Sequence, residues 1–229
     1  MASTIAIVGA GPGMGAAIAR TFGERGFDVA LIARNRAKLD ALAATLGEDG
    51  ITAAGFPADI LDHSALRAAL ADAAERFGGI DVLEHSPAPV ITDYHPTLPS
   101  QTTPESVQQH LDFQLSSALV ATAAVLPHMR EQGSGTLLYT TGAGSVDPVP
   151  VLGNINAAHA AVRNWVLNLH KELAPEGIQA AHVAIGVMIG DQPAIEGLPI
   201  GSAPAERIAP VYWDLHTTRE EAEVVFTAG

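Results

Sequence analysis

The feature that most constrains the fold of this chain is a glycine-rich turn close to its N-terminus. The apolar run at 5–8 predicts a short buried strand, and the alanine-rich segment after the turn predicts a helix. Gly9, Gly13 and Gly15 let the backbone between them turn sharply and approach an anion without Cβ clashes. The N–H groups and the dipole of the following helix favour a phosphate there. Met14 breaks the strict G-x-G-x-x-G spacing, so the prediction of a pyrophosphate site depends on the strand–turn–helix context.

The rest of the chain alternates short apolar runs with helical segments. The apolar runs predict strands at 5–8, 28–33, 51–56, 81–84, 136–140, 181–185 and 222–226. After the first helix, further helices are expected at 36–46, 64–77, 105–131, 154–173 and 205–215. This alternation predicts an α/β fold, a three-layer doubly wound parallel sheet of the Rossmann type, in a single domain at 1–229. In such a fold, ligands bind at the carboxyl ends of the strands.

Composition narrows the classes of function. Hydrophobic residues make up 48% of the 229 positions and charged residues 16%, which is typical of a compact globular core. A formal net charge of -13 argues against a nucleic-acid partner, and no apolar run approaches the length of a membrane span. The chain has no cysteine and no signal-peptide pattern, so we expect a cytoplasmic protein. Its nine histidines show no compact ligand spacing, and no metal site is expected.

Further motifs follow the glycine turn in a recognisable order. Val8 precedes a G-x-x-x-G-x-G pattern, Asp59-Ile60 follows the third predicted strand, and Thr141 ends the fifth. The segment at 171–178 leads into the next strand. This order resembles the short-chain dehydrogenase/reductase family across nearly the whole chain. The resemblance implies an oxidoreductase with a nicotinamide cofactor, in which Asp59 contacts the adenine and Thr141 takes the slot of a catalytic serine.

The end of the second predicted strand indicates which cofactor is expected. An acidic side chain there accepts a hydrogen bond from the ribose 2′-hydroxyl, whereas a basic one suits a 2′-phosphate. Ala33 occupies the acidic position and Arg34 follows it, so we predict NADP(H). In a simpler interpretation, Arg34 and Arg36 only solubilise a loop, and Asp59 caps the helix near Ser64. The predicted cofactor-binding residues are Gly9, Gly13, Met14, Gly15, Arg34, Asp59, Ile60 and His85.

The catalytic pair of the resembling family is missing. That pair is a tyrosine, which gives the proton, and a lysine four residues later on the same helix face. The positions four residues after Tyr94, Tyr139 and Tyr212 hold Leu98, Ala143 and His216. Alignment to the family places Ile155 in the tyrosine slot and His159 in the lysine slot. The stretch at 84–88 also replaces an Asn-Asn-Ala-Gly motif, and Gln114 replaces an asparagine of the family's proton relay.

Other side chains are candidates for the missing chemistry. An ordinary histidine pKa near 6.5 would let His159 act as an acid or base, or it would hydrogen-bond a ribose hydroxyl. Thr141 would orient a substrate oxygen, and His85 lies where nicotinamide or substrate is expected. Tyr94 and His95 lie in the following loop and would have to swing inward. Each also has a plain structural interpretation, as a packed helix residue, a strand-end cap or part of a loop.

The sequence therefore predicts an NADP(H)-binding oxidoreductase with an atypical proton relay, acting on a carbonyl, an alcohol or a related small molecule. The alternative is a non-redox protein on the same fold, either a cofactor-bound regulator or an isomerase or cyclase. Apolar helix segments at 115–126 and 162–169 favour a homodimer or homotetramer, with Trp165 as an interface or core anchor. A Gly- and Pro-rich stretch at about 186–205 is the expected substrate loop.

Overall fold

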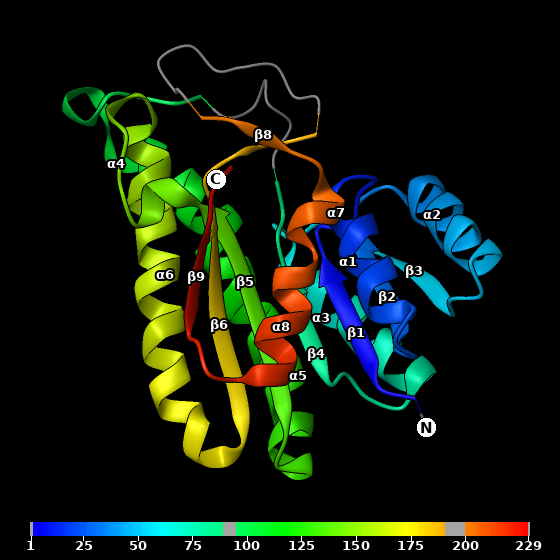
Figure 1. Cartoon of the computed structure of the whole chain (residues 1–229). Helices are drawn as coiled ribbons and strands as arrows, with labels where there is room; N and C mark the ends of the chain where they lie inside the picture. The colour runs from blue at the N-terminus through cyan, green and yellow to red at the C-terminus, as the bar shows by residue number, and fades with distance from the viewer. Residues whose placement is uncertain (1, 89–94, 191–199, 229) are drawn as a thin grey trace.

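The main sheet has seven parallel strands in the order β3-β2-β1-β4-β5-β6-β9 (Figure 1). It is seen in a computed structural model that describes residues 2–88, 95–190 and 200–228. The strands are β1 (Thr4–Val8), β2 (Asp28–Ala33), β3 (Ala53–Pro57), β4 (Val82–His85), β5 (Gly135–Gly142), β6 (Ile178–Ile185) and β9 (Glu223–Phe226). The predicted Rossmann-type parallel sheet is confirmed.

Helices cover both faces of this sheet. They are α1 (Met14–Gly23), α2 (Arg36–Glu48), α3 (His63–Phe77), α4 (Pro104–Leu111), α5 (Ser117–Gln132), α6 (Gly153–Leu173), α7 (Ala205–Ile208) and α8 (Pro210–Thr218). One buried cluster joins the sheet to α1, α2 and α8, and a second joins it to α3, α5 and α6. Because both faces are covered, every residue of β1, β4 and β6 is buried.

The order of the strands places a topological switch between β1 and β4. The chain runs outward from β1 through β2 to β3, and then returns to place β4 on the other side of β1. Crevices at such a point, outside the carboxyl ends of the strands, are where open α/β sheets bind ligands. The predicted glycine turn leaves β1 at this point, so the fold gives it the position that a nucleotide site needs.

One long helix was expected at 105–131, and this detail is wrong. The structure has α4, then a π-helical turn at Asp112–Ser116, and then α5. Thr103 accepts a hydrogen bond from the backbone N–H of Ser106 in a capping box, which starts α4 just before Pro104. The π turn buries the Gln114 side chain, whose amide donates a hydrogen bond to the carbonyl oxygen of Pro87 at 3.2 Å. The irregular turn therefore coincides with a tertiary contact.

The expected substrate loop at 186–205 contains two short strands. Strand β7 (Met188–Ile189) pairs in parallel with β8 (Ser202–Ala203), and β8 lies at the end of the molecule where the strands of the main sheet finish (Figure 1). Residues 191–199 of this loop lie outside the described residues. The expected helix at 205–215 is divided into α7 and α8, because Pro210 starts the second helix. In the described part of the chain, no helix is long and apolar enough to cross a membrane.

Candidate active site

The glycine turn after β1 is closed on one side and open on the other. Gly9 has a φ of 106°, and a Cβ at this position would lie 2.8 Å from the backbone of Ser86–Pro87 after β4. A Cβ at Gly15 would lie 2.8 Å from Cα of Ala10. No atom of the described residues lies within 4 Å of the place where a Cβ of Gly13 would stand, and Gly13 is exposed. Two glycines therefore bring backbone segments together, and the third leaves an open cradle.

Helix α1 starts directly at this cradle. Gly13 is its N-cap, and within the described chain no side chain caps the helix. Met14, the first helical residue, is half-buried. The first N–H groups of a helix have no partner inside it, and they carry the positive end of the helix dipole. The residues present therefore fit the pyrophosphate of a dinucleotide.

The segment after β2 presents one arginine without a fixed partner. Arg36 pairs along α2 with Asp40 at 2.8 Å, and Asn35 caps α2 through the backbone N–H of Lys38. Arg34 is exposed, and in the part of the chain that the structure describes no hydrogen bond or ion pair holds its guanidinium group. A guanidinium group offers a planar set of donors that suits a phosphate. Of the two predicted arginines, Arg34 is therefore the one with its donors available to a ligand.

Asp59 lies at the end of β3 and is exposed. One of its carboxylate oxygens accepts a hydrogen bond from the backbone N–H of Leu61 at 3.0 Å. The cap of α3 is Asp62, whose side chain accepts from the N–H groups of Ser64 and Ala65, so capping does not account for Asp59. The neighbouring Ile60 is buried in the core. An adenine role for the exposed Asp59 carboxylate stays a prediction.

The end of β4 points His85 into the core. Its side chain is buried, and Nε2 lies 2.9 Å from Oγ of Ser117 on α5. Burial lowers the pKa of His85 to about 3, so the ring is neutral. The backbone after His85, not its side chain, contacts the end of β1 beside the glycine turn. The N–H of Ser86 donates a hydrogen bond to the carbonyl oxygen of Val8 at 2.9 Å. The His85 side chain faces α5, and the next residues meet the predicted cofactor cradle.

The end of β5 meets α6 at Gly142, the residue after Thr141, whose backbone contacts His159. The Thr141 side chain is buried on β5, and Nδ1 of His159 accepts a hydrogen bond from the backbone N–H of Gly142 at 3.3 Å. Burial, with smaller contributions from His110 and His182, lowers the pKa of His159 to about 4. An ordinary histidine pKa near 6.5 was the wrong expectation. With Nδ1 as acceptor, the neutral ring carries its proton on Nε2 and acts as a hydrogen-bond donor.

Ile155 lies one helical turn before His159 and is 1% exposed. Its side chain belongs to the buried face of α6 and has no proton to give. Among the other candidates, Tyr94 lies outside the described residues, and the carbonyl oxygen of His95 accepts from the Asn154 amide at 3.1 Å. The Trp165 ring packs edge-on against Tyr139 at 5.1 Å, so within the chain it has the predicted role of a core anchor.

Four residues that the sequence analysis missed are linked to Thr141, either directly or through one another. The Thr141 hydroxyl lies 2.8 Å from Nε2 of His182 and 3.0 Å from Oγ of Ser145. His182 is itself 3.0 Å from Glu223, which pairs with Arg163. These residues are far apart in sequence and follow no known spacing. The available signal was His182 itself, a titratable residue in the middle of a strand that is otherwise apolar except for Gln179.

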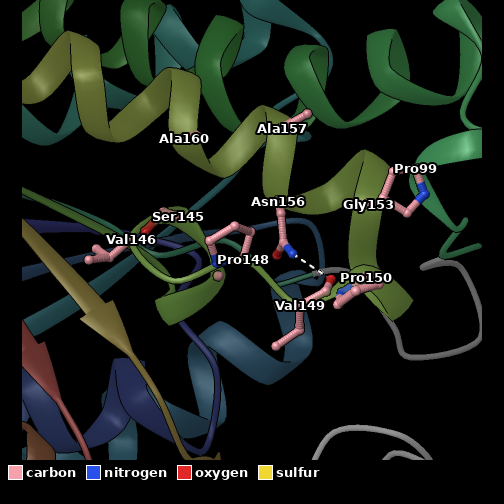
Figure 2. A pocket seen from close by; sticks show the side chains of 11 residues that line it. Pro99, Ser145, Val146, Pro148, Val149, Pro150, Gly153, Asn156, Ala157 and Ala160 are labelled. Atoms are coloured by element: carbon pink, nitrogen blue, oxygen red, sulfur yellow. Dashed lines mark hydrogen bonds between the residues drawn. The ribbon is translucent and has the colours of Figure 1, made fainter.

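A hollow of about 520 Å³ opens beside this cluster. It lies between the segment that follows β5 and the first turns of α6, with Ser145 and Val146 at one end and Pro99 at the other (Figure 2). Asn156 stands in its wall and donates a hydrogen bond to the carbonyl oxygen of Val149 at 2.9 Å. The volume suits a small molecule. Among the described residues, no group of three or more His, Cys, Asp or Glu is placed to hold a metal ion.

Comparison with known proteins agrees with this arrangement. The family profile described as short chain dehydrogenase matches residues 3–192. The chain is 28% identical over 186 residues to an uncharacterised oxidoreductase of Staphylococcus aureus, covering 80% of this chain and 76% of the relative. It is also 28% identical over 176 residues to dehydrogenase/reductase SDR family member 4 of Sus scrofa, covering 77% and 62% of the two chains.

The fold also matches a solved structure. L-sorbose reductase from Gluconobacter frateurii, complexed with NADPH and L-sorbose, superposes with a TM-score of 0.87 at 20% sequence identity. The match covers 100% of this chain and 96% of the reductase. At this identity the likeness concerns the fold, while the profile covers most of the sequence. The chain belongs to the short-chain dehydrogenase family.

Proposed function

We propose that the protein is an NADP(H)-dependent oxidoreductase that acts on a carbonyl, an alcohol or a related small molecule. The observation that carries this proposal is the open glycine cradle after β1, which stands beside an arginine whose donors are available. Gly9, Gly13 and Gly15 would hold the pyrophosphate, and Arg34 would bind the 2′-phosphate. Asp59 would contact the adenine.

NADP(H), when bound, supplies or accepts a hydride. The chain itself has to bind the substrate and move a proton. The hollow beside α6 is the substrate site that the geometry favours, because Ser145 in its wall connects directly to Thr141. His159 would donate a hydrogen bond from Nε2 to a bound ribose or substrate oxygen, since its lowered pKa keeps it neutral near pH 7. NADPH in the complex of L-sorbose reductase supports the choice of cofactor.

The cradle can be tested with two glycine substitutions. In Gly13→Ala, the added methyl group meets no described protein atom, so the free energy of unfolding should change little. NADPH affinity should nevertheless fall, because the methyl group would occupy space that the pyrophosphate needs. Gly47→Ala on α2 is the matched control, since its Cβ also meets open space. If both variants bind NADPH as tightly as the native protein does, the cofactor does not lie in this cradle.

The second candidate function is non-redox, as a cofactor-bound regulator or as an isomerase or cyclase on the same fold. Ile155 in the usual tyrosine slot favours it, because that side chain is buried and has no exchangeable proton. The two candidate functions differ in whether the protein oxidises NADPH when a substrate is present. Oxidation of one NADPH for each carbonyl reduced, in a panel of aldehydes, ketones and sugars, supports the oxidoreductase. Tight NADPH binding without oxidation across the panel supports the second candidate.

The setting of the enzyme is also part of the proposal. We expect a homodimer or homotetramer that is built on α5 and α6 and resides in the cytoplasm. Leu119 on α5 supports a subunit contact there, because its side chain is large, apolar and 43% exposed.

A further inference from the structure

A row of polar side chains connects three neighbouring strands. On β5, the Thr141 hydroxyl lies 2.8 Å from Nε2 of His182 on β6. On its other side, Nδ1 of His182 lies 3.0 Å from Oε1 of Glu223 on β9. The His182 side chain has no solvent exposure. A hydroxyl, an imidazole and a carboxylate are therefore in line at hydrogen-bond distances.

The carboxylate fixes which nitrogen of His182 carries the proton. Arg163 binds both oxygens of Glu223, at 2.5 and 2.8 Å, and this ion pair lowers the pKa of the carboxyl group. An ionised carboxylate only accepts hydrogen bonds, so Nδ1 of His182 has to donate. In the neutral ring, Nε2 is then the acceptor, and it faces the Thr141 hydroxyl.

The same reasoning extends to Ser145. A hydroxyl has one hydrogen to donate. The Thr141 hydroxyl has the geometry of a donor to Oγ of Ser145 at 3.0 Å and to the carbonyl oxygen of Gly142 at 3.1 Å. When a protonated His182 donates to the Thr141 oxygen, Thr141 can therefore pass its own hydrogen to Ser145. Ser145 stands in the wall of the hollow (Figure 2). The two hydroxyls thus form a short path from the hollow to the imidazole.

We propose that His182, oriented by Glu223, is the base of a hydroxyl relay that runs through Thr141 and Ser145 to the substrate in this hollow. The inference rests on the proposed oxidoreductase function and names the proton path of that same site. In the direction of oxidation, the alcohol gives its proton to Ser145, Ser145 gives one to Thr141, and Thr141 gives one to Nε2 of His182. When bound, the oxidised nicotinamide would accept the hydride from the carbinol carbon, so the products would be a carbonyl, the reduced nicotinamide and an imidazolium ion.

The charges around His182 suit this role. The Glu223 carboxylate stabilises the imidazolium that forms, as the carboxylate of a serine-protease triad does. The other charged or titratable groups near the ring come from α6, where Arg163 opposes its protonation and His159 is buried close by. Burial is the largest influence and lowers the pKa of His182, so the ring rests in its neutral, proton-accepting form. Carbonyl reduction is the reverse reaction and needs the imidazolium, so its rate should fall as pH rises through this pKa.

The proton positions can be tested without any substrate. Long-range ¹H–¹⁵N NMR spectra of the native protein at pH 7 should show His182 as the Nδ1–H tautomer. Thr141→Val keeps the side-chain shape and removes the hydroxyl, so it should shift the Nε2 resonance. Thr140→Val is the matched control, because the Thr140 hydroxyl lies near Glu84 and Tyr212 instead. An Nε2–H tautomer, or equal shifts in the two variants, overturns the relay.

Kinetics give an independent readout. His182→Gln and Thr141→Val should each lower kcat by about 10²–10⁴, the usual contribution of a positioned acid or base. They should also flatten the pH profile and leave the Kd of NADPH unchanged. Native-like kcat and pH profile in both variants would overturn the relay and leave the oxidoreductase standing. If the native protein oxidises no NADPH with any substrate, the proposed function fails, and the NMR result still decides how the histidine is protonated.

Discussion

Replacing Glu84 with glutamine should stabilise the protein by an amount that grows with pH. Glu84 lies at the end of β4 with no solvent exposure. Its oxygens accept hydrogen bonds from Ser86 at 3.0 Å and from Thr140 at 3.2 Å, and no lysine or arginine of the described residues pairs with it. Burial raises the pKa of this carboxyl group from 4.5 to about 8. Glutamine has the shape of the protonated acid and no charge to bury.

The size of the effect follows from this pKa. Between pH 4.5 and about 8, the folded protein keeps a proton on Glu84 that the unfolded chain has lost. The free energy of unfolding therefore falls as pH rises, by about 1.4 kcal/mol for each pH unit. Over the whole interval the native protein should lose about 5 kcal/mol from this group. Glu84→Gln should lack this loss, so its advantage over the native protein should grow by about the same amount.

Urea unfolding between pH 5 and 8, followed by tryptophan fluorescence, measures this difference. Glu131→Gln on the exposed surface of α5 is the matched control, because its charge lies in water in both the folded and the unfolded state. The free-energy difference between this control and the native protein should stay nearly constant with pH. A Glu84→Gln difference that is equally independent of pH would refute the reasoning, because it would mean that Glu84 is ionised in the folded protein.

The remaining predictions concern the proton donor and the assembly. Ile155→Tyr combined with His159→Lys restores the family pair on one helix face, and it should raise the rate of NADPH-dependent ketone reduction. No gain in a folded variant that still binds NADPH would favour the non-redox function. Light scattering at micromolar concentration should give the mass of a dimer or tetramer, and Leu119→Glu on α5 should reduce it. A native monomer would contradict the proposed α5–α6 contact.

Local signals account for the part of the fold that the sequence predicts. The run at 5–8 and the glycines after it specify a strand, a turn and a helix within about twenty residues. All seven predicted strands of the main sheet are present. The predictions were less accurate at 105–131, where a π turn interrupts the helix and its Gln114 contacts Pro87 in another part of the chain. The spacing of apolar residues along one helix does not predict a contact with a distant segment of the chain.

In the candidate site, too, local features were predictable from the sequence and contacts between distant residues were not. The sharp turn after β1 was predictable because it depends on local backbone geometry: Gly9 has a positive φ, and Gly15 lies against the backbone of Ala10. The side to which a buried residue points was harder, since His85 faces α5 and the adjacent Glu84 lies on the opposite face of the sheet. The pairing of His182 with Glu223 could not be predicted, because it depends on β6 and β9 being neighbours in the sheet.

Cofactor preference tests the central claim most directly. Isothermal titration of the native protein should show a lower Kd for NADPH than for NADH, by about tenfold or more, since hydrogen bonds to charged groups contribute about 1.5–3 kcal/mol. Arg34→Asp should narrow or reverse this preference, whereas Arg36→Asp should change it less, because Arg36 is already paired with Asp40. Equal affinities for NADPH and NADH in the native protein would contradict the proposed NADP(H) specificity.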